Sequence, residues 1–171
     1  MWRFFRPDEA AVFEAIAARI WPGDPDDPGA REAGAVIYLD RALADAYVHL
    51  QETYRRGLSA ANDSARLSYG RALPTLTDEE LDRLLVLMEA GELPGFEAPG
   101  AAEFFMLCIT HTMEGVFSDP VHGGNRDFVG WKAVGYPGPH YTYTEEDHRR
   151  FDRLDRSIQS VADLDPLRPD D

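Results

Sequence analysis

The chain has 171 residues, of which 44% are hydrophobic, and a net charge of −14 at pH 7; this predicts a single globular domain. So acidic a surface would repel nucleic acid and anionic lipid, which argues against both as partners. The single cysteine, Cys108, excludes an internal disulfide and a multi-cysteine metal site, and no apolar run reaches the length of a membrane span.

The first predicted helix runs from Pro7 to about Ile20. Proline suits the first helical turn, and the acidic pair Asp8 and Glu9 stabilises the positive end of the helix dipole. The helix must stop at WPGDPDDPG, residues 21–29, because prolines interrupt it. We interpret this linker as a rigid, solvated turn. The alternative is a cation site, which is less favoured because the calcium-loop pattern with its distant glutamate is absent; it would use Asp24, Asp26 and Asp27.

The second predicted helix is the longest, from about Ala30 to Arg56, with Gly57 as its natural stop. Asp40 falls within its apolar stripe, between Ile37 and Leu43. A buried carboxylate must be paired or hydrogen-bonded. We expect an ion pair with an arginine of another helix, in preference to contact with a bound partner, and we expect Asp40→Ala to destabilise the domain.

Two shorter helices are predicted next. One covers about Asp63–Leu73 and ends near Pro74. The other is opened by a capping box, in which Thr77 is followed three residues later by Glu80, and Gly91 ends it. Its leucine stripe indicates core scaffold.

The fifth predicted helix runs from about Pro99 to Thr112 or Glu114 and is apolar nearly all round. Such a helix is buried by neighbours on several sides, so we place it at the centre of the fold. Cys108 is then an inert core thiol. The helix presents His111 and Glu114 on one face, because they are three residues apart.

The stretch from His111 to Gly138 is the most unusual part of the sequence. Six glycines and two prolines argue against a helix or a regular strand, yet four large aromatic residues argue against a flexible linker. We therefore predict an ordered loop held by aromatic anchors, and long ordered loops are often functional. Ser118-Asp119-Pro120 is typical of a turn start, and Gly123-Gly124-Asn125 of a tight turn.

Four side chains near this loop allow a second interpretation, in which the chain is a stand-alone helical enzyme or metal-binding protein. The sequence lacks the paired Glu-x-x-His motifs of di-iron bundles and any His-Glu-x-x-His motif. We therefore expect the histidine and glutamate to bind loop backbone groups, and we assign no catalytic, cofactor or metal residues. The four residues are His111, Glu114, Asp119 and His122.

The sequence after Gly138 is predicted to be a C-terminal extension, residues 139–171. Thr144 and the acidic residues that follow it would open a last amphipathic helix, which we expect to end at about Val161. The whole chain is thus predicted to be all-α, a compact bundle of about five to six helices with a long ordered loop rich in glycine, proline and aromatic residues.

Two runs of residues resemble the gluconate 2-dehydrogenase subunit 3 family. One is H-T-x-E-G-x-F-S-D-P…G-G-N…G-W-K…G-Y-P-G, and the other is WPGDPDDPGAREAGAVIYLDRAL. The resemblance covers roughly residues 13–138 and assigns residues 1–138 to a helical domain of this kind. It implies a small non-catalytic subunit without a cofactor of its own. Its partner would be an FAD-carrying sugar or sugar-acid dehydrogenase of the glucose–methanol–choline type, often accompanied by a membrane-attached cytochrome c.

In this family interpretation the loop is the candidate surface for the flavoprotein. Trp131 has two compatible interpretations, an interface anchor and a pin that holds the loop on the fifth helix. The predicted partner-binding residues are His111, Glu114, Asp119, Pro120, Gly123, Gly124, Asn125, Trp131, Gly135, Tyr136, Pro137 and Gly138.

The first twenty residues do not resemble a secretion signal, because charged residues interrupt their apolar run. Family members commonly carry a twin-arginine signal, and this sequence departs from them there. We expect the chain as written to be cytoplasmic, and periplasmic if a pre-sequence precedes it or if it is exported with its partner.

Overall fold

The computed structural model describes residues 1–140, 142–149 and 156–164, and every regular element in these ranges is helical. This confirms the prediction of an all-α fold. The main helices are α1 (Pro7–Ile20), α3 (Ala35–Ala44), α4 (Gln51–Tyr69), α5 (Asp78–Glu89) and α6 (Ala101–Phe117). The shorter α-helices are α2 (Ala30–Ala33), α7 (Val129–Val134) and α8 (Glu145–Arg149). Single 3-10 turns are η1 (Val48–Leu50), η2 (Leu73–Thr75), η3 (Pro120–His122), η4 (Arg126–Phe128) and η5 (Val161–Asp163).

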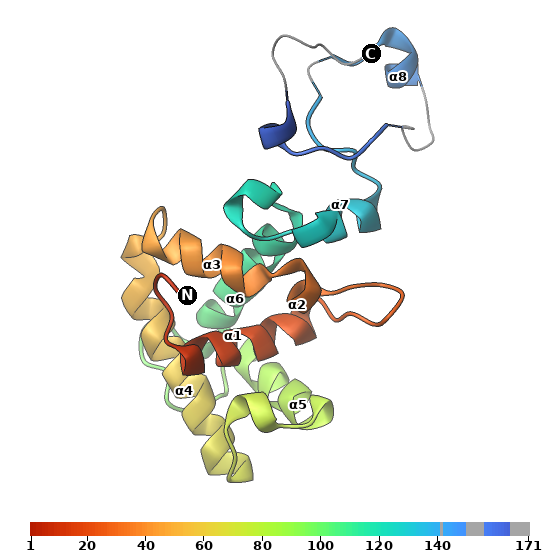
Figure 1. Cartoon of the computed structure of the whole chain (residues 1–171). Coiled ribbons are helices and arrows are strands. Elements are labelled where there is room, and N and C mark those ends of the chain that lie inside the picture. Colours follow the sequence, from red (N-terminus) through yellow and green to blue (C-terminus); the bar gives the residue numbers. More distant parts are fainter. Residues whose placement is uncertain (141, 150–155, 165–171) are drawn as a thin grey trace.

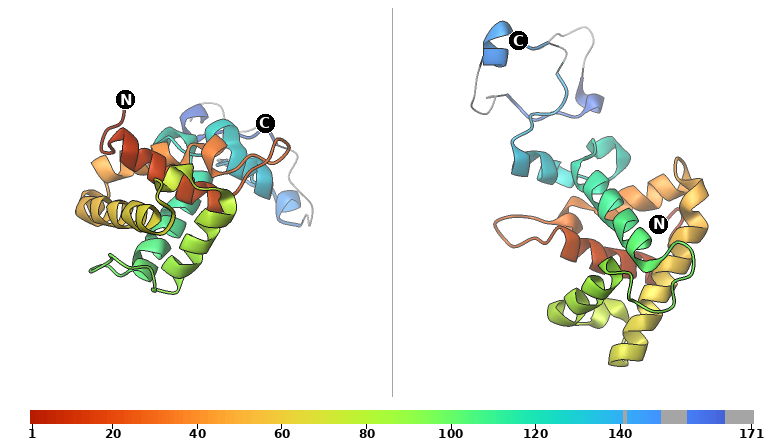
Figure 2. Two further views of the ribbon diagram at one scale, coloured as in Figure 1. Left: turned by 90° about the horizontal axis from the view of Figure 1, so that it is seen from below. Right: turned by 180° about the vertical axis from the view of Figure 1, so that it is seen from behind.

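Helix α6 lies at the centre of the bundle, as predicted. It contacts α1, α3, α4 and α5, and the 118–138 segment that follows it lies across one end of the helical body (Figures 1 and 2). None of the described helices combines the length and apolar character needed to cross a membrane. The largest fully buried side chains of the core include Phe13, Ile16, Leu39, Leu43, Tyr54, Leu58, Phe104 and Val116.

Local sequence signals set the ends of two helices. Helix α1 covers the predicted range. At the start of α5, the Glu80 backbone N–H donates to the Thr77 hydroxyl over 3.3 Å, and the Thr77 N–H donates to the Glu80 carboxylate over 2.9 Å. Gly91 follows α5 with a φ of +75°. The predicted capping box is therefore confirmed.

The predicted helix from Ala30 to Arg56 is wrong, because the structure divides this range. Gly34 takes a left-handed conformation, with a φ of +73°, and separates α2 from α3. A second break follows α3 at Asp45, whose backbone is not helical. Gly34 faces the backbone of Gly123 and the guanidinium of Arg126, so a tertiary contact with the 118–138 segment favours this break.

Gly57 does not stop a helix, and the separate helix predicted at Asp63–Leu73 does not exist. Gly57 and residues 63–69 fall on α4, which ends before the left-handed Gly70, and Leu73 begins η2. A Cβ atom at Gly57 would lie 2.4 Å from the ring of Phe104 on α6. Glycine is needed here because α4 and α6 pack closely, a reason that the local sequence does not reveal.

The predicted end of the fifth helix at Thr112 or Glu114 and the prediction of a loop without helix after it are both corrected. Helix α6 extends to Phe117, and α7 forms within the segment. Gly115 is tolerated inside α6 because its missing side chain lets the backbone of Ala35 approach; a Cβ would lie 2.8 Å from the Ala35 Cα. The irregular part is therefore shorter, and begins at Ser118.

Asp40 is buried, with 3% of its surface exposed, but the predicted ion pair with an arginine is wrong. Its two carboxylate oxygens accept hydrogen bonds from the backbone N–H groups of Arg3, Phe4 and Phe5, at 2.7, 2.9 and 2.9 Å. These bonds stabilise the buried carboxylate, because ionised acceptors make strong hydrogen bonds. Asp40 thus fixes the N-terminal arm of the chain on α3.

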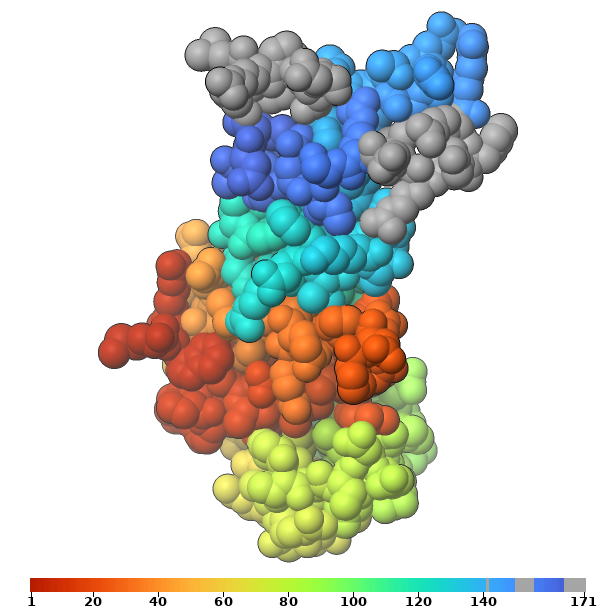
Figure 3. Space-filling model, turned by 45° about the vertical axis from the view of Figure 1, so that its right-hand side comes forward, coloured from red at the N-terminus to blue at the C-terminus, as the bar shows by residue number. Residues whose placement is uncertain are grey.

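The described part of the C-terminal extension lies beyond α7, at the end of the molecule opposite α5 (Figure 3). The predicted helix from Thr144 to Val161 is corrected in part. It begins where expected, since α8 covers Glu145–Arg149 and the Thr144 hydroxyl accepts from the Asp147 N–H. Residues 156–160, however, are not helical. Phe151 and Leu154, two apolar residues within the range of this predicted helix, lie outside the described residues.

Candidate functional site

The 118–138 segment is fixed to the end of α6 by a buried asparagine. The side chain of Asn125, which is fully buried, donates to the Ser118 carbonyl over 2.9 Å and accepts from the Gly130 N–H over 2.9 Å. Its backbone N–H donates to the Gly115 carbonyl over 2.8 Å. One residue therefore joins the start of the segment, its middle and the preceding helix.

Trp131 makes a second anchor. Its indole N–H donates to the Phe117 carbonyl at the end of α6 over 2.8 Å, and only 5% of its surface is exposed. Its ring packs against Phe128 and, edge to face, against Tyr136. Trp131 is thus the pin that holds the segment on α6, one of the two roles that the sequence left open.

Two glycines bring the segment into direct backbone contact with α6. A Cβ at Gly124 would lie 2.1 Å from the Gly115 carbonyl oxygen, and one at Gly130 would lie 2.1 Å from the Val116 carbonyl oxygen. Real side chains do not fit at such distances. These positions require glycine because of close approach, not because of a positive φ.

Backbone strain is concentrated next to these contacts. Asn125, Asp127 and Phe128 have φ angles of +45°, +54° and +58°, in the left-handed region that non-glycine residues rarely occupy. Such conformations persist only where the surroundings enforce them. The shape of the segment is therefore imposed by its packing.

His111 and Glu114 belong to a cluster of tyrosines, so their predicted bonding to loop backbone is wrong. The Glu114 carboxylate accepts from the hydroxyls of Tyr38 at 2.9 Å and Tyr47 at 3.0 Å. The Nδ1 atom of His111 lies 2.6 Å from the Tyr54 hydroxyl. The cluster joins α3, the turn before η1, α4 and α6.

The electrostatics of the cluster favour its uncharged phenols and imidazole. Burial, and then the bond to Glu114, raises the pKa of Tyr38 and Tyr47. Burial lowers the pKa of His111, against the opposing effect of Glu114. Protonated phenols can donate to the glutamate, so the cluster acts as a structural clamp. Sequence reasoning missed the tyrosines, although buried tyrosines usually need a partner for their hydroxyl.

Asp119 connects the segment to the C-terminal extension. Its carboxylate accepts from the Val121 N–H within η3, from the Ser160 hydroxyl at 2.6 Å and from the Val161 N–H at 2.8 Å. Partial burial by itself raises the pKa of Asp119, but these hydrogen bonds outweigh it and lower the pKa. Gly138 lies against the carbonyl oxygen of Gln159 and allows the same approach.

The predicted partner-binding residues differ widely in exposure, and direct contact with a partner stays a prediction for all of them. Only Tyr136 is exposed, at 41%. The half-buried positions are Glu114, Asp119, Pro120, Gly123 and Gly135. The buried positions are His111, Gly124, Asn125, Trp131, Pro137 and Gly138.

The four side chains of the metal or enzyme interpretation have different surroundings. His111 and Glu114 belong to the tyrosine cluster, Asp119 binds the C-terminal extension, and His122 is exposed. Within the described ranges, no three metal-binding side chains come together, and this includes Asp24, Asp26 and Asp27. Cys108 is buried, and burial raises the pKa of its thiol.

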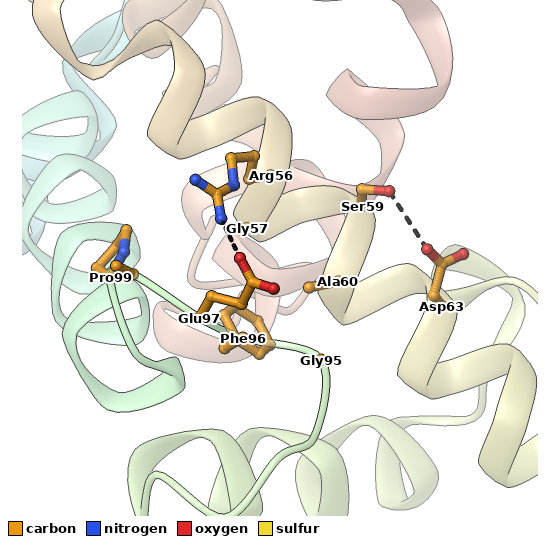
Figure 4. Close-up of a pocket in the computed structure, with 10 residues that line it drawn as sticks. Arg56, Gly57, Ser59, Ala60, Asp63, Gly95, Phe96, Glu97 and Pro99 are labelled. Carbon is orange, nitrogen blue, oxygen red and sulfur yellow. Dashed lines mark hydrogen bonds and ion pairs between the residues drawn. The ribbon is translucent and has the colours of Figure 1, made fainter.

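Two hollows on the surface differ in whether their charged side chains are paired. One, of about 320 Å³, lies between α4 and residues 95–99. Its charged side chains have partners: Arg56 donates to Glu97 over 2.9 Å, and the Asp63 carboxylate accepts from the Ser59 hydroxyl over 3.3 Å (Figure 4). The other, of about 390 Å³, lies between α3 and η3. In the described part of the chain, its two arginines form no ion pair.

The fold and the site define a class of protein: a helical domain capped by a rigid segment that is fixed on its central helix. The chain matches the gluconate 2-dehydrogenase subunit 3 family over residues 7–138, and it belongs to that family. The family name describes one subunit of a dehydrogenase complex. No curated protein and no solved structure matches the chain.

Proposed function

We propose that the chain is an accessory, non-catalytic subunit of an FAD-dependent sugar or sugar-acid dehydrogenase. It would bind a flavoprotein of the glucose–methanol–choline type and support its folding, export or activity. The family match over residues 7–138 carries this proposal. In this interpretation the flavin and the redox chemistry belong to the partner, and the present chain contributes a preformed binding surface.

The 118–138 segment supports the proposal because its backbone is rigid while some of its apolar side chains are exposed. Val121, Val134 and Tyr136 are 42%, 61% and 41% exposed. Large apolar side chains on a rigid backbone lose little conformational entropy on binding, and tyrosine is frequent at the centre of interfaces. We infer that the buried predicted residues shape the segment, whereas these exposed ones contact the flavoprotein.

Co-expression with a candidate flavoprotein tests the accessory role. We expect the tagged chain to capture the flavoprotein, and we expect dye reduction with sugars or sugar acids to require co-expression. If the flavoprotein is fully active when expressed alone and elutes separately, the accessory role is contradicted.

A pair of matched variants tests the surface. Val134 on the segment and Val86 on α5 are exposed to the same extent, at 61% and 62%. We expect Val134→Asp to weaken flavoprotein capture by about tenfold or more, because it places a charge in an apolar contact. Val86→Asp should leave capture unchanged. Equal effects of the two variants would move the interface away from the 118–138 segment.

A further inference from the structure

The hollow between α3 and η3 combines features that the accessory role does not explain. Its volume of about 390 Å³ lies in the range of small-molecule sites, roughly 300–1,000 Å³. It is formed where α3, the turn after it and the start of the 118–138 segment meet. The polar residues that line it include Arg3, Arg41, Asp45, Tyr47, Ser118 and His122.

The hollow is locally basic on a strongly acidic chain. Arg3 and Arg41 both line it, and in the described ranges neither forms an ion pair. By contrast, the arginines of α1 and α4 that line other surfaces, such as Arg19 and Arg56, have carboxylate partners within 3 Å. The protein has 31 acidic residues and 17 basic ones. Two unpaired guanidinium groups in one hollow therefore favour the binding of an anion there.

The position of Arg41 is fixed by its surroundings. The guanidinium lies against Gly123, where a Cβ would come within 2.8 Å of it, and one of its N–H groups points to the Val121 carbonyl at 3.4 Å. That distance gives only a weak hydrogen bond. Among the described residues, the side-chain hydrogen-bond donors of Arg41 other than this N–H have no hydrogen-bond partner. A guanidinium can present two parallel N–H groups to a carboxylate.

The other polar groups of the hollow favour an anion that also has hydroxyl groups. Tyr38 and Tyr47 donate their hydrogens to Glu114, so towards a bound molecule they offer acceptor oxygens. The Asp45 carboxylate is a further acceptor and reduces the local positive charge.

We propose that this hollow binds a carboxylate through Arg3 and Arg41. The carboxylate comes either from a free hydroxylated acid or from an acidic side chain of a protein partner. The proposal goes beyond the accessory role, which does not require an anion site.

Calorimetric titration of the purified full chain with sodium gluconate tests the free-acid source, with glucose as the neutral polyol of similar size. We expect one saturable gluconate site and no heat with glucose. Arg41→Gln should weaken gluconate binding by about tenfold or more, because it removes a charge-assisted pair. Arg83→Gln, which changes an exposed arginine on α5, is the control and should bind like the unsubstituted chain. Arg3→Gln provides a second test at an exposed position if Arg41→Gln proves unstable.

Flavoprotein capture by the same variants tests the second source. If gluconate does not bind but Arg41→Gln loses capture and Arg83→Gln retains it, the carboxylate belongs to the partner. If gluconate binding is absent or insensitive to Arg3→Gln and Arg41→Gln, and capture is unchanged in both, the proposal is overturned. Capture by the unsubstituted chain would then still support the accessory role, so the two proposals can fail separately.

Discussion

The linker at residues 21–29 and the segment at residues 118–138 are both rich in glycine, but they are held in different ways. In the linker, the Asp24 carboxylate accepts from the N–H groups of Asp26 and Asp27, both at 2.8 Å, and these aspartates are exposed. In the longer segment, the anchors Asn125 and Trp131 are buried and bind the end of α6.

The difference shows which residues make an irregular segment part of the core. An aspartate that bonds its own neighbours forms a turn that is complete in itself. An asparagine and a tryptophan whose partners lie on another element tie the segment to that element. Destabilisation should therefore be largest for changes at the anchored segment and smallest for changes at the linker.

We expect the largest effect from Gly124→Ala. The new Cβ would lie 2.1 Å from the Gly115 carbonyl oxygen, so the segment must move away from α6 at a cost of about 3 kcal/mol. Urea denaturation measures the change. Gly100→Ala is the control, because no atom lies within 4 Å of its Cβ position; similar losses in both variants would refute the close-contact explanation.

Asn125→Ala should lower the free energy of unfolding by about 2–3 kcal/mol, because it removes two buried hydrogen bonds and places alanine at a positive φ. Asn125→Gly lacks the same bonds but tolerates the backbone angle, so it should be less destabilising by about 1 kcal/mol. Thermal and urea unfolding of the two variants separate the contribution of the side-chain hydrogen bonds from the cost of the positive φ. A glycine variant as stable as the unsubstituted chain would mean that the side-chain bonds contribute nothing.

Asp40→Ala extends the comparison to the N-terminal arm. It should lower the free energy of unfolding by about 2 kcal/mol, because three backbone N–H groups lose a charged acceptor. The matched control is Asp45→Ala at the exposed end of the same helix. The melting temperature should fall only for Asp40→Ala. Equal melting temperatures would show that the arm is not fixed by this carboxylate.

Lowering the pH should release the C-terminal extension from Asp119. The folded-state pKa lies below the usual 3.8, so the contribution is fully present above 3.8 and is lost as the pH falls through the lower folded value. We expect it to be no more than about 1 kcal/mol for this partly exposed group. Hydrogen exchange of the Val161 amide measures it. Asp119→Asn should remove the pH dependence; if the variant keeps it, another group is responsible.

Asp24→Ala should have the smallest effect, about 0.5 kcal/mol, because the lost hydrogen bonds are exposed to water. Thermal unfolding with and without calcium measures both stability and the cation alternative. We expect no response to calcium. A raised melting temperature with calcium that Asp24→Ala abolishes would support the cation site instead.

The sequence predicted well those features that depend on neighbouring residues. The start of α1 at Pro7 and the capping box of Thr77 and Glu80 are local, and both were confirmed. The wrong predictions concern features that depend on a residue far away in the sequence. Gly57 ends no helix because Phe104 packs on it, and Asp40 binds backbone N–H groups because the N-terminal arm folds over α3.

The candidate site shows the same limit. The importance of residues 111–138 could be predicted from their glycines and aromatic residues, but the division into buried anchors and exposed contacts could not. Whether Trp131 faces a partner or α6 depends on where the Phe117 carbonyl lies. The basic hollow was missed because Arg3, Arg41 and Ser118 are far apart in the sequence and meet only in the folded chain.

The sequence by itself determined the helical class of this protein, its family and the segment on which its proposed function depends, because periodicity, caps and motifs are written in neighbouring residues. The tertiary structure decided the rest: which glycines allow close packing, which carboxylates are satisfied and by what, and which side chains remain exposed. These properties depend on contacts between distant residues, and such contacts exist only once α6 and the 118–138 segment have packed together.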